Sequence, residues 1–139
     1  MSRDLPPQPR PDADTAPFWE AARAGKLALC RCSACKRWHQ PPLERCRACG
    51  APTRFEEVAG TGRLASFIVV RHPAVPGYLH DLPYVVGLVE LDEQRGLRLP
   101  GRIVGAEPEA LAIGQRLRAE LVPLAGSEER VAVFRRTGA

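Results

Sequence analysis

The apolar residues of this chain follow a helical spacing near the N-terminus and strand-like runs in the second half. Pro17 begins the first pattern and Gly25 ends it, which predicts a short helix over residues 15–25. Phe18 and Ala22 lie four residues apart and therefore share a face of this helix. Because so short a helix is unstable alone, we expect it to dock on another part of the molecule.

Five later runs are rich in β-branched and apolar residues and are bounded by glycine, proline or charged residues, which predicts β-strands. Apolar and polar residues alternate cleanly in the fourth run, so this strand should be half buried. Residues 107–114, between the third and fourth runs, predict a short helix or turn that ends at Gly114. Five strands with a helical connection at this place follow the order of an OB-fold, a small, partly open Greek-key barrel. The runs cover residues 63–71, 84–91, 97–104, 116–122 and 130–135.

Four cysteines form two Cys-x-x-Cys pairs with ten residues between them. Each pair can present two thiolates to one ion at about 2.3 Å, and two pairs complete a closed tetrahedral shell with no position left for water or substrate. We therefore predict a zinc ribbon whose metal is structural. Its ligands are Cys32, Cys35, Cys46 and Cys49.

Three other interpretations of these cysteines are less favoured. Disulfides are rare in the cytosol, and the proline-rich, polar N-terminus does not resemble a signal peptide. A thioredoxin-like redox motif stands alone after a strand, whereas here two motifs are paired. Iron of the rubredoxin type fits the same sulfur shell, so the choice of zinc over iron is an expectation that geometry alone leaves open.

Two residues near the pairs are weaker candidates for metal binding or reactivity. Cys30 lies two residues before the first pair, a spacing that cannot replace Cys32 without breaking the turn. We expect it to be a small packing residue and not a reactive thiol. His39 lies between the pairs, but four cysteines already complete the shell. We expect a surface histidine at this position.

These patterns predict a mainly β protein with a short N-terminal helix, a Cys₄ zinc ribbon and a five-stranded OB-fold barrel. The expected division is a flexible arm over residues 1–16, a helix and ribbon over 17–57, and the barrel domain over 58–139. A module of about 40 residues usually needs a metal or disulfides to fold, which agrees with a metal in the segment that is poor in apolar residues.

The formal net charge of +4 is concentrated in the ribbon, where eight basic residues and one acidic residue lie between Arg23 and Arg54. A zinc ion with four thiolates is itself negative. The basic residues either offset that charge or attract the phosphate of a nucleotide-bearing cofactor or of nucleic acid, and the sequence leaves both open. The longest apolar runs are only a few residues, so we expect no membrane span and a cytoplasmic protein.

The combination of a Phe-Trp helix, a Cys₄ ribbon and a five-stranded barrel resembles one particular family. These are the rubredoxin-like zinc-ribbon plus OB-fold acyl-CoA-associated proteins, formerly a domain of unknown function. The resemblance covers nearly everything after residue 16. It is carried by Pro17 to Glu20, Leu29 to Cys35, Pro41-Pro42, Cys46 to Gly50, Gly60-Thr61-Gly62, Ser66 to Pro73, Pro83 to Leu91 and Ile113-Gly114.

The resemblance implies an accessory subunit without an active site of its own. Members of that family accompany thiolases, lipid-transfer-protein-like aldolases or MaoC-like enoyl-CoA hydratases in acyl-CoA or steroid metabolism. It implies structural zinc as the cofactor and acyl-CoA as a possible ligand. The family often has a polar pair in the third strand, where this chain has Leu99-Pro100-Gly101-Arg102, and proline at this point predicts a strand edge or bulge.

Candidate ligand-binding or partner-binding residues lie on the helix, on the strands and in the loop over residues 72–84. In OB-folds the loop between the first two strands commonly borders the binding face. The aromatic residues of the helix would form a partner surface if exposed, although docking on the chain's own domain is the commoner outcome. The candidates are Phe18, Trp19, Phe67, Arg71, His72, Tyr78, His80, Tyr84 and Arg102.

Two other functional classes are possible for a ribbon joined to a barrel. A single-stranded nucleic-acid-binding module would stack bases on barrel aromatics, but no basic stripe accompanies Phe67, Tyr78, Tyr84 and Phe134. An independent enzyme would need a base such as His80 oriented by Asp81, yet adjacent loop residues rarely point at each other. Since no catalytic set is present in the sequence, we expect no catalytic residues and no activity of the chain alone.

Overall fold

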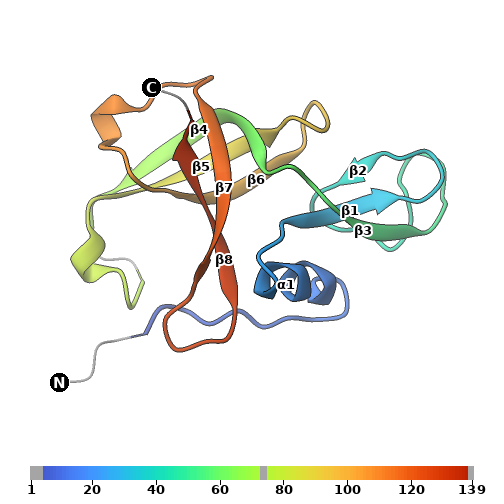
Figure 1. Cartoon of the computed structure of the whole chain (residues 1–139), viewed down its shortest axis with the longest axis horizontal. Helices are drawn as coiled ribbons and strands as arrows, with labels where there is room; N and C mark the ends of the chain where they lie inside the picture. The colour runs from blue at the N-terminus through green and yellow to red at the C-terminus, as the bar shows by residue number, and fades with distance from the viewer. Residues whose placement is uncertain (1–4, 73–74, 138–139) are drawn as a thin grey trace.

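The computed structural model describes residues 5–72 and 75–137 of the chain. A small three-stranded sheet lies beside a closed five-stranded barrel (Figure 1). The predicted fold class, mainly β with a short N-terminal helix, a ribbon and a barrel, is confirmed. The sheet has the order β2-β1-β3, with strands β1 (Ala28–Cys32), β2 (Trp38–His39) and β3 (Thr53–Glu57). The barrel has the order β4-β5-β6-β8-β7, with strands β4 (Thr61–Val70), β5 (Tyr84–Leu91), β6 (Arg98–Ile103), β7 (Arg116–Pro123) and β8 (Arg130–Arg136).

The barrel closes through two short strand contacts. β4 pairs with β5 along most of its length but with β7 only over residues 61–63, and β6 runs parallel to β8 and pairs with it at two positions. A bulge between Leu64 and Ser66 bends β4, as closure of a small barrel requires. All five predicted strands are present, and the predicted helical connection contains the 3₁₀ turn η2 (Pro108–Ala110). These observations confirm the OB-fold order.

The barrel interior is an apolar core whose largest fully buried side chain is Phe134. Gly101 on β6 leaves the space that this ring occupies, since a Cβ there would lie 2.6 Å from Phe134 Cε2. Strand register explains the approach, because the parallel β6–β8 pairing begins one residue beyond Gly101. The other fully buried core side chains of the barrel are Leu64, Val89, Leu91 and Leu117.

Helix α1 (Ala16–Arg23) contacts both β1 of the sheet and β8 of the barrel (Figure 1). Ala22 is fully buried, and Phe18 packs against the core with part of its ring exposed. Arg23 Nε donates hydrogen bonds to both carboxylate oxygens of the buried Glu129, at 3.1 and 3.2 Å. The predicted docking of the helix is therefore confirmed, and an ion pair between Arg23 and Glu129 fixes its C-terminal end.

We expect Arg23→Gln to destabilise the protein more than Glu129→Gln does. The first change leaves a buried carboxylate without its partner, which costs about 1–3 kcal/mol of the free energy of unfolding, whereas the second returns a half-exposed arginine to water. Urea denaturation of the two variants checks the order. Equal losses would show that the pair contributes only through its hydrogen bonds.

The side chain of Gln94, in the hairpin between β5 and β6, joins the ribbon to the barrel. Trp38 N–H donates to Gln94 Oε1 at 2.8 Å, and Gln94 Nε2 donates to the Trp38 carbonyl at 3.1 Å. Trp38 lies on β2, an outer strand of the sheet. The side-chain amide of Gln94 therefore pairs with the Trp38 backbone as a residue of a neighbouring strand would. Two hydrogen bonds from one planar group fix both distance and direction between the two β-structures.

Gln94→Leu is expected to leave zinc stoichiometry unchanged while loosening the ribbon from the barrel. Two hydrogen bonds are lost, so the free energy of unfolding should fall by about 1–3 kcal/mol, and the Trp38 amide should exchange faster with solvent. Amide exchange followed by NMR measures this. Gln115→Leu is the matched control, because the Gln115 amide accepts only from Ala112 within its own turn. Unchanged exchange at Trp38 would contradict the role of Gln94.

Asp92 and Glu93, which precede Gln94, secure the linker from ribbon to barrel. Asp92 pairs with Arg116 through two contacts of 2.7 and 2.5 Å and accepts from Thr61 Oγ1 at 2.8 Å. The hydrogen bonds from Arg116 hold the pKa of Asp92 at about 2. The Ala59 N–H donates to Glu93 at 2.8 Å. Three successive side chains of one hairpin thus determine where the ribbon leaves the barrel.

The described part of the N-terminal arm, residues 5–15, has no strand or helix and crosses the β7–β8 turn in the view of Figure 1. Pro6 is buried against Gly77, and the Leu5 side chain lies over Gly126. Gln8 Nε2 donates to the carbonyl of Ala125 at 3.0 Å. This part of the arm therefore contacts the barrel, although the expected flexibility of residues 1–16 stays a prediction.

Candidate metal centre and partner surface

The two Cys-x-x-Cys pairs form two turns of the same local construction. In each turn the first cysteine N–H donates to a carbonyl five residues later, Cys32 to Arg37 and Cys46 to Ala51, both at 2.8 Å. The residue after the second cysteine has a left-handed backbone, with φ of 69° at Lys36 and 76° at Gly50. Glycine adopts this conformation readily, whereas lysine does so at some cost, which a bound metal can offset.

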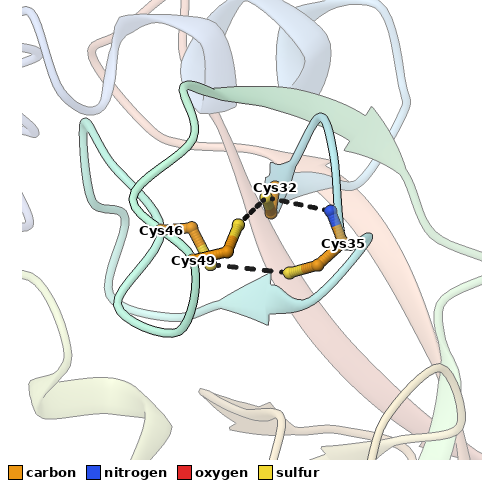
Figure 2. Close-up of side chains that lie close together, drawn as sticks. All are labelled: Cys32, Cys35, Cys46 and Cys49. Atoms are coloured by element: carbon orange, nitrogen blue, oxygen red, sulfur yellow. Dashed lines mark hydrogen bonds between the residues drawn. The ribbon is translucent and has the colours of Figure 1, made fainter.

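The four sulfur atoms meet between these turns (Figure 2) and all lie within 4.8 Å of one another. Cys32 Sγ lies 3.5 Å from Cys49 Sγ, and Cys35 Sγ lies 3.6 Å from Cys46 Sγ. A tetrahedral zinc ion with bonds of about 2.3 Å places its sulfur ligands about 3.8 Å apart, so the sulfur positions fit the ion. None of the five cysteines, all of which lie in the described residues, forms a disulfide, which excludes that alternative in this structure.

Backbone N–H groups stabilise the charged form of the thiols. Cys32 Sγ accepts from the N–H groups of Ala34 and Cys35 at 3.4 and 3.3 Å, and Cys46 Sγ accepts from Ala48 at 3.3 Å. Burial alone raises the pKa of Cys32, but these N–H groups and the neighbouring thiols lower it to about 6. Metal binding requires the thiolate, so the turns prepare the first cysteine of each pair for zinc. The Arg37 N–H lowers the pKa of Cys35, but the neighbouring thiols raise it to about 11.

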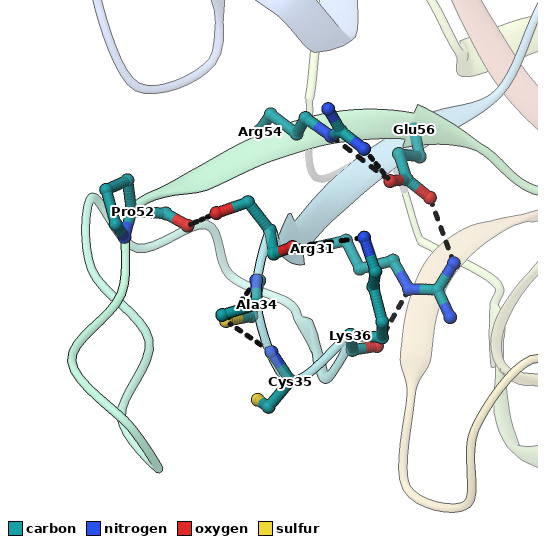
Figure 3. A network of polar contacts seen from close by, with 9 residues as sticks. Arg31, Ala34, Cys35, Lys36, Pro52, Arg54 and Glu56 are labelled. Atoms are coloured by element: carbon teal, nitrogen blue, oxygen red, sulfur yellow. Dashed lines mark hydrogen bonds and ion pairs between the residues drawn. The ribbon is translucent and has the colours of Figure 1, made fainter.

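Arg31 illustrates how the basic residues of the ribbon are used (Figure 3). Its Nη1 lies 2.9 Å from Glu56 Oε2, its Nε donates to the Lys36 carbonyl at 2.7 Å, and its guanidinium stacks 4.6 Å above the Trp38 ring. Arg54 also pairs with Glu56, at 3.2 Å. Hydrogen bonds from Arg31 lower the pKa of Glu56. This part of the ribbon's positive charge is therefore committed to its own fold.

Cys30 and His39 occupy paired positions on β1 and β2. Cys30 is buried and its Sγ donates to the Leu43 carbonyl at 3.3 Å, which confirms the predicted packing role. The prediction of a surface histidine is wrong, because β2 turns His39 inward and leaves it only 7% exposed. Burial, followed by Arg37 and Arg47, lowers the pKa of His39. Its Nε2 has no hydrogen-bond partner among the described residues.

The predicted partner residues fall into several environments. Phe18 and Trp19 meet edge to face at 5.1 Å and are both half buried, and Phe67 packs against the core. The sequence could not predict this depth of burial. An apolar face of a helix or strand has the same residue pattern whether or not another element covers it. Arg71 and His72 are exposed at the end of β4.

Tyr78, Tyr84 and Arg102 are brought together on the outer face of the barrel. The two tyrosine rings lie 5.5 Å apart, and the Arg102 guanidinium lies 5.2 Å from the Tyr84 ring. Arg102 Nη1 also pairs with Asp81 Oδ2 at 3.0 Å. Asp81 and His80 lie in the 3₁₀ turn η1 (Leu79–Asp81), with His80 exposed. The partner of Asp81 is thus Arg102, and no described contact orients His80 as a base.

Two family models match consecutive parts of the chain. Residues 19–56 match the model described as the ChsH2 rubredoxin-like zinc ribbon domain, and residues 55–122 match the model described as the ChsH2 C-terminal OB-fold domain. The chain belongs to the ChsH2 zinc-ribbon and OB-fold family. Membership assigns zinc to the four-sulfur cluster, so the metal of this ribbon is structural zinc.

Curated relatives of this ChsH2-type chain include two enzyme subunits that are longer than the chain itself. A probable enoyl-CoA hydratase alpha subunit of Thermomonospora curvata is 42% identical over 79% of this chain and 34% of its own length. The 3-oxo-4,17-pregnadiene-20-carboxyl-CoA hydratase alpha subunit of Mycobacterium tuberculosis is 34% identical over 88% of this chain and 38% of its own length. A DUF35 domain-containing scaffold protein of Methanocaldococcus jannaschii is 36% identical over 64% of this chain and 62% of its own length. The chain spans about a third of the length of the two hydratase subunits.

Solved structures of the ChsH2 and DUF35 type match nearly the whole chain. A chain of the Ltp2-ChsH2(DUF35) aldolase is 37% identical, covers 93% of this chain and 98% of that chain, and has a TM-score of 0.83. A DUF35 protein from Sulfolobus solfataricus shares the fold at 14% identity with a TM-score of 0.59. No helix in the described part of the chain has the length and apolar character needed to cross a membrane.

Proposed function

We propose that this chain is a non-catalytic accessory or scaffolding subunit that binds a CoA-dependent enzyme and helps to hold its acyl-CoA. The observation that carries the proposal is the near-complete match, over 98% of its length, to the chain from the Ltp2-ChsH2(DUF35) aldolase. The partner class is therefore an aldolase of the lipid-transfer-protein type, a thiolase-like enzyme or a MaoC-like hydratase. The hydratase-subunit names of two relatives support the same classes.

The described site supports binding more than chemistry. Zinc is enclosed by four cysteines and so has no open position for substrate, and Asp81 is engaged by Arg102. The chain's residues would bind the enzyme and orient its acyl-CoA. Gln94 holds the ribbon against the barrel, and Arg23 holds α1. Two of the four barrel aromatics give a nucleic-acid role no support, because Phe134 is fully buried and Phe67 packs against the core. Tyr78 and Tyr84, beside Arg102, are the two that a base could reach.

A hollow of about 350 Å³ beside the Tyr78–Tyr84–Arg102 cluster is the proposed acyl-CoA contact. Arg102 and Asp81 offer a donor and an acceptor side by side, which suits an amide group, and the adjoining wall is mainly aliphatic. The arm contributes Pro6 to its rim. The remaining wall residues are Gly77, Val122, Pro123, Leu124, Ala125, Val131, Ala132 and Val133.

The first test is affinity purification of the tagged chain from its native host, with mass spectrometry of whatever remains bound after a moderate-salt wash. The proposal expects a thiolase-like, aldolase-like or hydratase-like enzyme in near-stoichiometric amount. Recovery of RNA-associated proteins that leave as salt rises would overturn it in favour of nucleic acid.

Arg102→Gln tests the surface, with Arg98→Gln as the matched control because both arginines lie on β6 and both pair with an acidic residue. We expect only Arg102→Gln to weaken the interaction with the enzyme or with acyl-CoA, by about tenfold. Equal effects of the two changes would place the contact elsewhere. The same comparison applies to alanine variants of Phe18, Trp19, Phe67, Arg71, His72, Tyr78, His80 and Tyr84, the other exposed or half-exposed candidates.

A further inference from the structure

Arginines gather on the outer face of the barrel where β4, β7 and β8 adjoin. Strand register places Arg63 opposite Arg116 and Arg118 opposite Arg135. Like charges directly opposite each other on neighbouring strands destabilise a sheet. The barrel gains no core packing from these side chains, since all of them are exposed. Negative charge near these arginines would therefore reduce their mutual repulsion and stabilise this part of the barrel.

The described residues supply only part of that negative charge. Asp92 pairs with Arg116, and Glu120 lies 2.6 Å from Arg135. Within residues 5–72 and 75–137, no acidic side chain forms an ion pair with Arg118 or Arg136. Arg63 also has no ion pair in this part of the chain. Arg63 and Arg118 thus remain available on this face, and Arg136, which pairs with Leu117, lies beside it at the end of β8.

Arg118 and Arg136 line one hollow of about 450 Å³, distinct from the one beside Arg102. Three arginines and one glutamate contribute to its wall, so the wall carries two more positive than negative charges. A guanidinium presents parallel N–H donors that match the oxygen spacing of a phosphate and do so better than a lysine. The complete wall is Arg118, Ala119, Glu120, Arg135, Arg136 and Thr137.

We infer that this hollow, between β7 and the end of β8, is a binding site for a phosphate-bearing small molecule, with Arg118 and Arg136 as the contacting residues. A phosphate group carries nearly two negative charges at neutral pH, which balances the excess of the wall. Glu120 holds Arg135 in place and leaves the other two guanidinium groups to the ligand.

The position of the hollow suggests one source of the phosphate. Arg118 and Val122 lie four residues apart on β7, a distance of about 13 Å along the strand, and Val122 belongs to the hollow beside Arg102. A ligand with phosphates at one end and an amide-bearing chain, such as acyl-CoA, could reach both. The inference of a phosphate site depends on the arginines alone. Only the choice of acyl-CoA as the source of the phosphate rests on the proposed function.

Binding of pyrophosphate and of adenosine 3′,5′-bisphosphate to the zinc-loaded protein tests the site, by calorimetry and by NMR shifts of the Ala119 and Thr137 amides. We expect the double variant Arg118→Gln/Arg136→Gln to weaken pyrophosphate binding by about tenfold or more. Arg10→Gln/Arg95→Gln is the matched control. It removes the same total charge from two exposed positions outside the hollow and should leave the affinity nearly unchanged.

Each outcome decides the inference. Equal losses in both double variants, or no pyrophosphate binding by the unaltered protein at moderate salt, would overturn it, as would single-stranded DNA bound through the two arginines without pyrophosphate binding. Tighter binding of the bisphosphate than of pyrophosphate would identify the nucleotide end of CoA, and equal binding would identify free phosphates as ligands. Co-purification of an enzyme is measured separately, so the proposed function and the phosphate site can fail independently.

Discussion

Cys46→Ser is expected to abolish stoichiometric zinc binding and to unfold the ribbon. Cys46 is one of four sulfur atoms in a closed shell, and a hydroxyl at this position is a far weaker zinc ligand than a thiolate. The binding free energy of a structural zinc ion, about 10–16 kcal/mol in isolated zinc-finger peptides, is also folding free energy of the module that it closes. The barrel has its own core and is expected to remain folded. Zinc content by atomic emission, with circular dichroism of the same sample, measures both results.

Cys30→Ser is the matched control for this experiment. It makes the same chemical change in the same ribbon, but Cys30 lies outside the sulfur cluster and donates to the Leu43 carbonyl, which a serine hydroxyl can also reach. The control should bind one zinc ion per chain. Equal serine variants of Cys32, Cys35 and Cys49 should behave like Cys46→Ser. Undiminished zinc in any of the four would contradict the assignment of that ligand.

Phe134→Ala is expected to lower the free energy of unfolding of the barrel by about 3–5 kcal/mol, because it removes the largest fully buried side chain and leaves a cavity. Ile68→Ala is the control, since Ile68 is 63% exposed and should cost less than about 0.5 kcal/mol. Chemical denaturation with the zinc site loaded measures both. Similar values for the two changes would show that the ring is not a core residue.

Gly101 makes this test sharper. Gly101→Ala alone should destabilise the protein by about 1–3 kcal/mol, because its Cβ would lie 2.6 Å from Phe134 Cε2. In the Phe134→Ala background the same methyl group enters the vacated space and should cost much less, the remaining cost coming from the Ala132 carbonyl oxygen at 3.1 Å. The double-mutant cycle therefore predicts strong non-additivity, and simple addition of the two losses would place the cause in the β6 backbone.

Much of the fold could be predicted because its signals are local. The spacing of the four cysteines requires two similar turns, and the alternation around Leu117 marks a half-buried strand whatever its neighbours are. The helix over residues 15–25 was also detectable from Pro17 and Gly25. Each of these predictions depends on residues close in sequence, where the chain's own geometry decides the outcome.

The remainder depends on contacts between distant residues. His39 is buried because β2 pairs with β1, and nothing in its local sequence distinguishes that position from an exposed loop. Gln94 is an unremarked polar residue of a hairpin until the fold brings it to Trp38, 56 positions away. Tyr84 and Arg102 likewise meet only after β5 and β6 pair. The partner surface was therefore predicted as a set of separate residues and not as an arrangement.

The amide of Gln94 has one further consequence, which concerns self-association. Unpaired backbone groups at the side of a sheet can recruit a strand from another molecule and so begin aggregation. At Trp38 both backbone groups are already taken by the Gln94 side chain, so the two-residue strand β2 offers no template there for another copy of the chain. The hydrogen bonds that orient the ribbon thus also protect the protein against aggregation across this edge.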